Sequence, residues 1–150
     1  MGIRQAIEGH RRIMFDTAPI VYFIEEHKEF GKIADEIFKV IKDDSEYRPF
    51  SSVITLIEVL TQPLRKSKME VVEKYRQFLL NSSNFITYSI DPIIAEKSAE
   101  MRLRAQYGIK TPDAIQLAVG IENDGTLFVT NDRDLKKIKE IEVIVLEEYL

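Results

Sequence analysis

The 150-residue chain has no cysteine and only two histidines. Without cysteine it forms neither disulfide bonds nor a thiolate metal site, and a reducing cytoplasm is the compartment that we expect. His10 and His27 are too few and too isolated for a histidine-based zinc site, so we interpret each as a surface residue. Disulfide-stabilised and zinc-stabilised folds are therefore excluded.

The sequence also lacks any uninterrupted apolar run near the ~18 residues that a membrane helix needs. Its first residues, MGIRQAIEGHRR, have no apolar core of the kind found in secretory signals, so we expect no membrane segment. Apolar and charged residues are abundant, at 45% and 31% of the chain. A chain of this length and composition is sufficient for one domain with a hydrophobic core.

The net charge of −4, from 21 basic and 25 acidic residues, has the wrong sign for general attraction to nucleic-acid phosphates. If bound metal ions neutralised four acids in one site, however, the rest of the chain would carry no net charge. Two local basic stretches are then candidates for phosphate contact, although solvated helix faces explain them equally well. They are Arg65, Lys66 and Lys68 in one, and Arg102, Arg104 and Lys110 in the other.

Short apolar segments alternate along the chain with longer segments of helical period. The predicted strands are 12–15, 47–50, 85–88, 127–130 and 143–146. The predicted helices are a short N-terminal arm within 1–12, then 20–24, 30–41, 52–60, 69–80, 92–105 and 112–121, and a short basic helix after residue 134. Such alternation indicates parallel βαβ units. We therefore predict one α/β domain over residues 1–150, a three-layer α/β/α sandwich with a mainly parallel sheet of about four to five strands.

Proline, glycine and capping residues set the predicted helix ends. Pro19 opens predicted helix 20–24, and the run TQP at 61–63 ends predicted helix 52–60. Gly108 is the predicted left-handed stop after helix 92–105. Thr111 is the predicted N-cap of the next helix, with Pro112 as its first residue.

An acid opens the helix that follows Pro112. Asp113 lies in its first turn, where the helix dipole stabilises a carboxylate by ~0.3–1 kcal/mol. The segment AIQLAVGI after it places apolar side chains around most of the helix and predicts a largely buried helix. The dipole alone explains an acid at this place, so a functional role for Asp113 requires other acids to converge on it.

Three further acids are predicted at one edge of the sheet. Asp16 follows the first strand and Asp132 follows strand 127–130, and ligands of parallel sheets bind beyond the carboxyl ends of the strands. Glu58 lies in an otherwise apolar helix that leaves the same edge. Each position has a simple structural explanation, such as an N-cap or Asx turn for Asp16 and a solvent-facing position for Glu58.

Four carboxylates within a few ångströms of one another raise each other's pKa and destabilise the fold. A bound divalent cation removes this conflict. Because the ligands are all oxygens, Mg²⁺ or Mn²⁺ fits them better than the softer metals do. The sequence therefore predicts a magnesium or manganese site.

Four segments resemble the acidic motifs of PIN-domain nucleases, in the single-domain form of VapC-type toxins. They are Asp16-Thr17 after an apolar strand, SVITLIE at 52–58, DAIQLA at 113–118 and VTNDRDL at 129–135. The order and spacing are those of the family, and the resemblance extends from about residue 13 to residue 146. It implies a PIN-like fold, a metal-dependent endoribonuclease acting on single-stranded or loop RNA, and a cognate antitoxin as inhibitor.

The resemblance also assigns roles to residues. The first three acids map to Asp16, Glu58 and Asp113, and the fourth maps to Asp132, with Asp134 as a further candidate ligand. One or two bound Mg²⁺ would activate a water molecule, and Glu58 would ligate the ion or accept the proton of that water. Candidates to orient carboxylates or substrate are Thr17, Thr55, Thr130 and Asn131. Candidates to contact RNA are Arg102, Arg104 and Lys110.

Two other classes of function remain open. A phosphoaspartyl enzyme also carries an aspartate after its first strand, but its D-x-D pair is absent because Thr17 and Ala18 follow Asp16. A non-catalytic RNA-binding domain of this fold would have lost at least one of the acids, and none is lost.

The segment 19–41 is rich in large apolar residues for one side of a small sheet. We therefore predict that part of it faces another chain, as a homodimer contact that also binds an antitoxin peptide. The large residues include Tyr22, Phe23, Phe30 and Phe38. The arm at 1–12 is longer than in the shortest family members, which suits dimerisation or partner binding.

Overall fold

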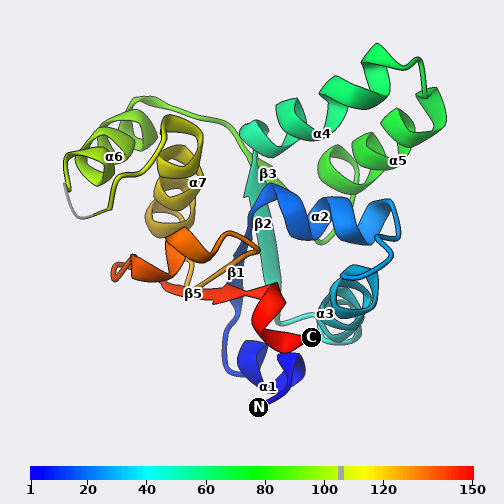
Figure 1. The fold of residues 1–150 in the computed structure, drawn as a ribbon, viewed down its shortest axis with the longest axis horizontal. Helices are drawn as coiled ribbons and strands as arrows, with labels where there is room; N and C mark the ends of the chain where they lie inside the picture. Colours follow the sequence, from blue (N-terminus) through cyan, green and yellow to red (C-terminus); the bar gives the residue numbers. More distant parts are fainter. Residues whose placement is uncertain (105–106) are drawn as a thin grey trace.

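Five parallel strands form one sheet in a computed structural model that describes residues 1–104 and 107–150 (Figure 1). The strands are β1 (Arg12–Phe15), β2 (Arg48–Ser52), β3 (Ile86–Tyr88), β4 (Leu127–Thr130) and β5 (Glu142–Val145). Their order is β3-β2-β1-β4-β5, and every neighbouring pair is parallel. The strand order therefore reverses between β1 and β4, whose carboxyl ends lie side by side. The predicted parallel sheet is confirmed.

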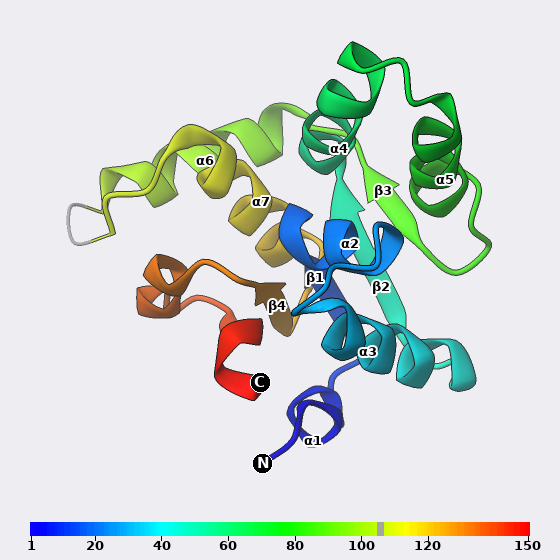
Figure 2. The same ribbon diagram turned by 45° about the vertical axis from the view of Figure 1, so that its right-hand side comes forward.

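Helices cover both faces of this sheet. The helices are α1 (Ile3–Ile7), α2 (Thr17–Ile24), α3 (Gly31–Asp43), α4 (Val53–Arg65), α5 (Met69–Leu80), α6 (Pro92–Leu103) and α7 (Thr111–Glu122), with the 3₁₀-helices η1 (Arg133–Lys137) and η2 (Leu146–Tyr149). Figures 1 and 2 show α2, α3 and α5 on one side of the sheet and α6 and α7 on the other. This is the predicted α/β/α arrangement. None of the helices in the described part of the chain is long and apolar enough to span a bilayer.

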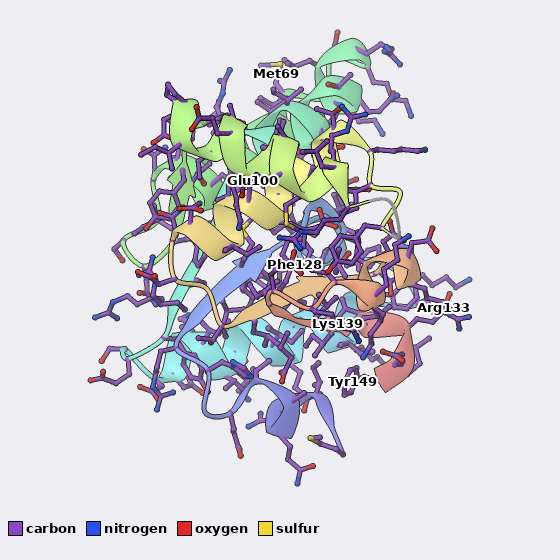
Figure 3. The ribbon with its side chains drawn as sticks, turned by 90° about the vertical axis from the view of Figure 1, so that its left-hand side faces the viewer. Met69, Glu100, Phe128, Arg133, Lys139 and Tyr149 are labelled. Carbon is purple, nitrogen blue, oxygen red and sulfur yellow. The ribbon has the colours of Figure 1, made fainter. Side chains whose placement is uncertain are left out.

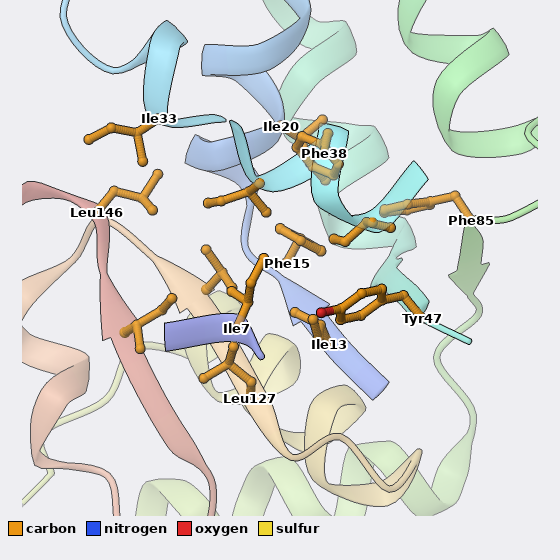
Figure 4. Close-up of a cluster of buried hydrophobic side chains, with 14 of the residues drawn as sticks. Ile7, Ile13, Phe15, Ile20, Ile33, Phe38, Tyr47, Phe85, Leu127 and Leu146 are labelled. Carbon is orange, nitrogen blue, oxygen red and sulfur yellow. The ribbon is translucent and has the colours of Figure 1, made fainter. Parts of the chain in front are cut away.

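Alternate residues of the buried strands feed two separate hydrophobic clusters, because successive strand side chains point to opposite faces. Ile13 and Phe15 of β1 pack with residues of α1, α2, α3 and α5, and Figure 4 shows Phe15 within this cluster. The rings of Phe15 and Phe38 stack at 4.8 Å. Met14 packs on the opposite side, in a cluster that includes Phe128 of β4 and residues of α6 and α7. The layer of α6 and α7 faces the viewer in Figure 3, where Phe128 is labelled. Each helical layer thus has its own core.

The N-terminal arm packs on the body of the domain. Its helix α1 buries Ile3 and Ile7 in the first cluster. His10, interpreted from the sequence as a surface residue, is partly exposed and lies between two side chains. Its Nδ1 is 2.8 Å from Thr126 Oγ1 and its Nε2 is 3.0 Å from Glu142 Oε2. The histidine therefore ties the arm to the segments that begin β4 and β5.

The helix α4 runs past its predicted end at residues 61–63. Pro63 lies inside its last turns with a buried side chain, and a proline removes only one backbone hydrogen bond there. The final turn still closes, since Lys66 N donates to Gln62 O at 3.0 Å. The helix stops before Ser67, which has a φ of 55°, and Lys68 N donates to Pro63 O at 2.8 Å. The left-handed residue, and not the proline, ends the helix.

Two helix starts also differ from the prediction. The helix α2 begins at Thr17, two residues before Pro19, because the Asp16 side chain accepts from Thr17 N and caps it. The helix α7 begins at Thr111, and Lys110 occupies the N-cap without a side-chain cap bond. The prediction of Thr111 as the cap was therefore wrong by one residue. Proline at the second position of α7 is tolerated because the first N–H groups of a helix have no intrahelical partner.

The ends of α6 and β5 are shifted as well. The helix α6 ends at Leu103, two residues before its predicted end, and Leu103 is 82% exposed. Gly108 has the predicted left-handed conformation, with a φ of 56°, yet it stands well beyond the end of the helix. Ala105, the predicted last helical residue, lies outside the described residues. The strand β5 ends one residue earlier than predicted, because Leu146 opens η2.

Candidate functional site

Asp16 lies where the central strand β1 ends and α2 begins. Its Oδ1 accepts a hydrogen bond from Thr17 N at 2.8 Å, so the residue is the helix cap that the simplest interpretation predicted. Its Oδ2 accepts from Thr130 Oγ1 at 2.8 Å, at the end of the neighbouring strand β4. One oxygen is thus held by the first residue of α2 and the other by the last residue of β4, at the point where the strand order reverses. The capping role and a site role are compatible.

Glu58 reaches the same place from α4. Its Oε1 accepts a hydrogen bond from Thr17 Oγ1 at 2.5 Å, while the rest of the residue is exposed. The Thr17 hydroxyl also lies 3.2 Å from Thr55 Oγ1, and Thr55 is fully buried one turn before Glu58. The first and second acids are therefore joined through Thr17.

Asp113 lies half-buried in the first turn of α7. Burial, followed by the negative charges of Asp16, Asp132 and Glu58, raises the pKa of its carboxyl to about 6, and Lys110 partly opposes this. Three acids that are far from Asp113 in sequence therefore act on it in the folded chain. None of them takes part in an ion pair within 4.0 Å among the described residues.

The pKa of Asp16 is also raised above its ordinary value. Burial is the main cause, and the charge of Glu58 adds to it. Hydrogen bonds from Thr130, Thr17 and Gln116 work in the opposite direction, because they stabilise the charged carboxylate. Asp16 and Asp113 thus both hold a proton more tightly than an isolated aspartate does.

The polar residues in the loop after β4 make different contacts. Asp132 N donates to Thr130 Oγ1 at 3.1 Å, and Asp132 Oδ1 accepts from Asp134 N at 2.9 Å to cap η1. The side chain of Asp134 is exposed and is not among the charges that raise the pKa of Asp113. Asn131 turns away to α2 and η2, donating to Tyr22 Oη at 3.0 Å and accepting from Glu147 N at 2.8 Å. Of these candidates, the structure brings Asp132 and Thr130 to the acids.

Of the three basic candidates, one acts on the acids. Lys110, directly before α7, lowers the pKa of Asp113. Arg102 Nε donates to Ile109 O at 3.4 Å, and Arg104 Nε lies 3.4 Å from Glu140 Oε2. Both arginines are therefore engaged in holding the connection between α6 and α7.

A buried polar group at the site was not identified from the sequence. Gln116 on α7 is 1% exposed, and its Nε2 donates to Thr55 Oγ1 at 2.8 Å and lies 3.5 Å from Asp16 Oδ1. Its Oε1 accepts from Ser52 Oγ at 2.5 Å. The available signal was an amide within an apolar helix, three residues after Asp113 and therefore on the same helix face.

The ligand atoms at the site fit a hard divalent cation in type and in charge. They are carboxylate and hydroxyl oxygens, and no lysine, arginine or histidine in the described part of the chain forms an ion pair with the acids. Within residues 1–104 and 107–150, no three acidic or histidine side chains stand close enough to chelate an ion by themselves. Mg²⁺ does not need such a cage, because it keeps several waters and is held by one or two carboxylates together with substrate phosphates.

The raised pKa of Asp113 predicts how stability depends on pH in metal-free protein. When the folded-state pKa of a carboxyl exceeds its unfolded value, the free energy of unfolding of the protein falls as pH rises. For Asp113 this fall begins near pH 3.8 and is complete above about pH 6. Asp113→Asn has no such proton. Its free energy of unfolding relative to wild type should therefore increase by on the order of 1 kcal/mol between pH 4 and pH 7.5.

Denaturant unfolding in chelator measures this difference. Asp35→Asn, which removes an exposed aspartate on α3, is the matched control for the loss of one charge. A difference between Asp113→Asn and wild type that stays constant over this pH range, once the control is subtracted, would contradict the repulsion.

Residues 13–141 match the PIN domain. Several solved structures share the fold. VapBC2 from Rickettsia felis, bound to a DNA fragment from its promoter, has a TM-score of 0.71 at 20% identity, over 89% of this chain and 98% of the other. A toxin–antitoxin complex from Klebsiella pneumoniae has a TM-score of 0.65 at 25% identity, over 89% and 97%.

DNA-bound VapBC from Salmonella typhimurium is also similar, with a TM-score of 0.67 at 19% identity, over 91% of this chain and 98% of the other. Comparison with curated proteins gives no match. The resemblance predicted from the four acidic motifs is confirmed by the match over residues 13–141 and by these structures. This chain belongs to the PIN domain family.

Proposed function

We propose that the protein is a magnesium-dependent endoribonuclease and the toxin of a toxin–antitoxin pair, acting in the cytoplasm. The observation that carries the proposal is the convergence of Asp16, Glu58 and Asp132 on Asp113 at the reversal of strand order, where their charges act on its carboxyl. Proteins of the PIN family are generally nucleases, and the similar structures are toxin–antitoxin complexes. The choice of RNA and of magnesium rests on the motif resemblance and on the all-oxygen ligand set.

The acids have distinct tasks in this proposal. Asp16, Asp113 and Asp132 hold one or two Mg²⁺, directly or through water. The bound ion lowers the pKa of an attacking water and neutralises charge that develops on the phosphodiester. Glu58 is fixed by Thr17 at Oε1, and its Oε2 has no hydrogen-bond partner among the described residues. That second oxygen is available to ligate the ion or to accept a proton.

The hydrogen bonds of Asp16 orient its carboxylate and leave a lone pair on each oxygen for a metal ion. Its Oδ1 accepts from Thr17 N and its Oδ2 from Thr130 Oγ1, so both oxygens are oriented by donors. A phosphoaspartyl enzyme would use one of these oxygens as its nucleophile, but the D-x-D pair of that class is absent here, because Thr17 and Ala18 follow Asp16. An acid-stable phosphate trapped on Asp16 would support that alternative class of enzyme.

Lys110 is the best placed of the proposed RNA contacts. Its charge acts on Asp113, so it lies where a phosphate near the acids would need a counter-charge. Arg102 and Arg104 flank the same connection and extend the proposed contact, although Arg104 would first have to leave Glu140.

We also propose that the chain forms a homodimer and binds its antitoxin through the side that carries α2 and α3. A groove of about 700 Å³ is open there, between α3, α5 and the segment before β3. Its apolar residues include Phe23, Phe38, Phe78 and Phe85. An apolar antitoxin segment fits this groove, and a basic antitoxin residue would neutralise the acids.

The nuclease proposal predicts that purified protein cleaves RNA with Mg²⁺ and not in excess chelator. Asp16→Asn and Asp113→Asn should each lower the cleavage rate by more than the ~10–100-fold that is typical for removal of an outer partner of a metal ligand. Both variants should remain folded, since each change conserves side-chain shape. Single-turnover cleavage of a structured RNA, with circular dichroism for folding, measures both effects.

Asp35→Asn is the control and should cleave as wild type does, because Asp35 is exposed on α3 and makes no contact with the four acids. Cleavage that persists in excess chelator, or near wild-type rates for either site variant, would contradict the proposed mechanism.

The partner proposal predicts that the chain, of 17.4 kDa, has twice that mass by light scattering at micromolar concentration. Phe78→Glu places a charge in the groove and should shift the mass to that of a monomer. Leu103→Glu is the control, because Leu103 is 82% exposed on α6, on the opposite face of the sheet, and it should remain dimeric. A strictly monomeric wild type would count against the dimer.

A further inference from the structure

Four of the buried polar side chains meet beside the acids. Ser51, Ser52 and Thr55 are fully buried, and Gln116 is 1% exposed. On α7 the amide of Gln116 lies among apolar neighbours, since Ala114 and Leu117 are both fully buried. A buried amide is costly unless its donors and acceptor are all bonded, so its partners define its task.

The contacts of Ser52 fix which way the Gln116 amide points. Ser52 caps α4 by accepting from Ile54 N at 3.1 Å, and its hydroxyl donates to Gln116 Oε1 at 2.5 Å. The nitrogen of the amide must therefore face the other way. There Nε2 has two hydrogens and two acceptors, Thr55 Oγ1 at 2.8 Å and Asp16 Oδ1 at 3.5 Å.

From Thr55 the contacts continue to Glu58. Because Thr55 Oγ1 accepts from Gln116, its own proton is available for Thr17 Oγ1 at 3.2 Å, and Thr17 then donates to Glu58 Oε1 at 2.5 Å. Ser51 Oγ lies 2.8 Å from both Phe15 O and Thr55 Oγ1, and its single proton can be donated to only one of them. When Ser51 donates to Thr55, the Thr55 proton is left for Thr17. One amide is thus connected directly to the first acid and through two hydroxyls to the second.

We propose that Gln116 is a positioning residue for the acidic site. It holds Asp16 by a direct contact and Glu58 through Thr55 and Thr17, so that two carboxylates that repel each other keep a fixed separation. This inference rests on the proposed function, in which these acids hold a metal ion. Groups behind the ligands typically change metal affinity or activity by 10–100-fold when removed.

Gln116→Met tests the proposal, because methionine has a similar length and volume but cannot donate to Thr55 or Asp16. In metal-free protein, the NMR order parameters of the Thr17 and Thr55 methyl groups should fall below their wild-type values. The dissociation constant for Mn²⁺, measured by electron paramagnetic resonance, should rise by about tenfold. A space-filling role for Gln116 would leave both quantities unchanged.

Ser98→Ala is the matched control. Ser98 is also buried and donates a hydrogen bond, to Ile94 O at 2.7 Å on α6, but it has no contact with the acids. It should lower thermal stability without changing the threonine order parameters or the Mn²⁺ affinity. If Gln116→Met does not fold, Thr55→Val provides the test at the next group, since it keeps the side-chain shape and removes the hydroxyl.

A folded Gln116→Met whose threonine order parameters and Mn²⁺ affinity both equal those of wild type would overturn the positioning role. Wild-type protein that binds no Mn²⁺ would overturn the proposed function instead. The order parameters are measured without metal, so they decide the role of Gln116 in either case.

Discussion

The repulsion among four carboxylates is the constraint around which this chain is arranged. Burial and the charges of Asp16, Asp132 and Glu58 raise the pKa of Asp113 to about 6. None of the four carboxylates forms an ion pair with a basic side chain among the described residues. Clustered like charges lower the stability of a fold. In the proposed function, a bound divalent cation compensates for this clustering.

The parallel sheet makes this cluster geometrically possible. Because β1 and β4 are neighbours with the same direction, the residues that follow them, Asp16 and Asp132, leave the sheet at one edge. The helices α4 and α7 bring Glu58 and Asp113 to the same edge. Hydroxyl and amide groups then hold the carboxylates, with Thr130 on Asp16 and Thr17 on Glu58. The site is therefore a property of the topology and of a buried polar network together.

Much of the fold could be predicted because it depends on local patterns. Strand β1 spans the predicted residues, and the apolar stripes of α3 and α5 identified these helices. Helix ends were harder, because they depend on competing hydrogen bonds. Pro63 looked like a stop, yet the turn after it closed and Ser67 ended α4. The helix α6 stops two residues before its predicted end, at Leu103, which is exposed.

The residues of the candidate site were also only partly predictable from the sequence. Its acids could be named from the sequence, because carboxylates after parallel strands share an edge and because four motifs occurred in a family's order. The residues that hold the acids could not, because their partners come from distant segments. In the sequence, Gln116 is one residue of a predicted helix with no sign of a special role. Its contacts with Ser52 and Thr55 form only when α4 and α7 pack together. Asn131 lies next to Asp132 in sequence, yet it bonds to Tyr22 and not to the acids.

The most direct measurement of the central claim is the effect of Mg²⁺ on stability, because it requires no knowledge of the RNA. At pH 7, Mg²⁺ at about 100 times its dissociation constant should raise the free energy of unfolding of wild type by about 2.7 kcal/mol relative to chelator. Asp113→Asn should retain little of this gain. A full Mg²⁺ gain in Asp113→Asn, together with lower stability than wild type in chelator, would show that Asp113 is only a helix-start acid and would contradict the account.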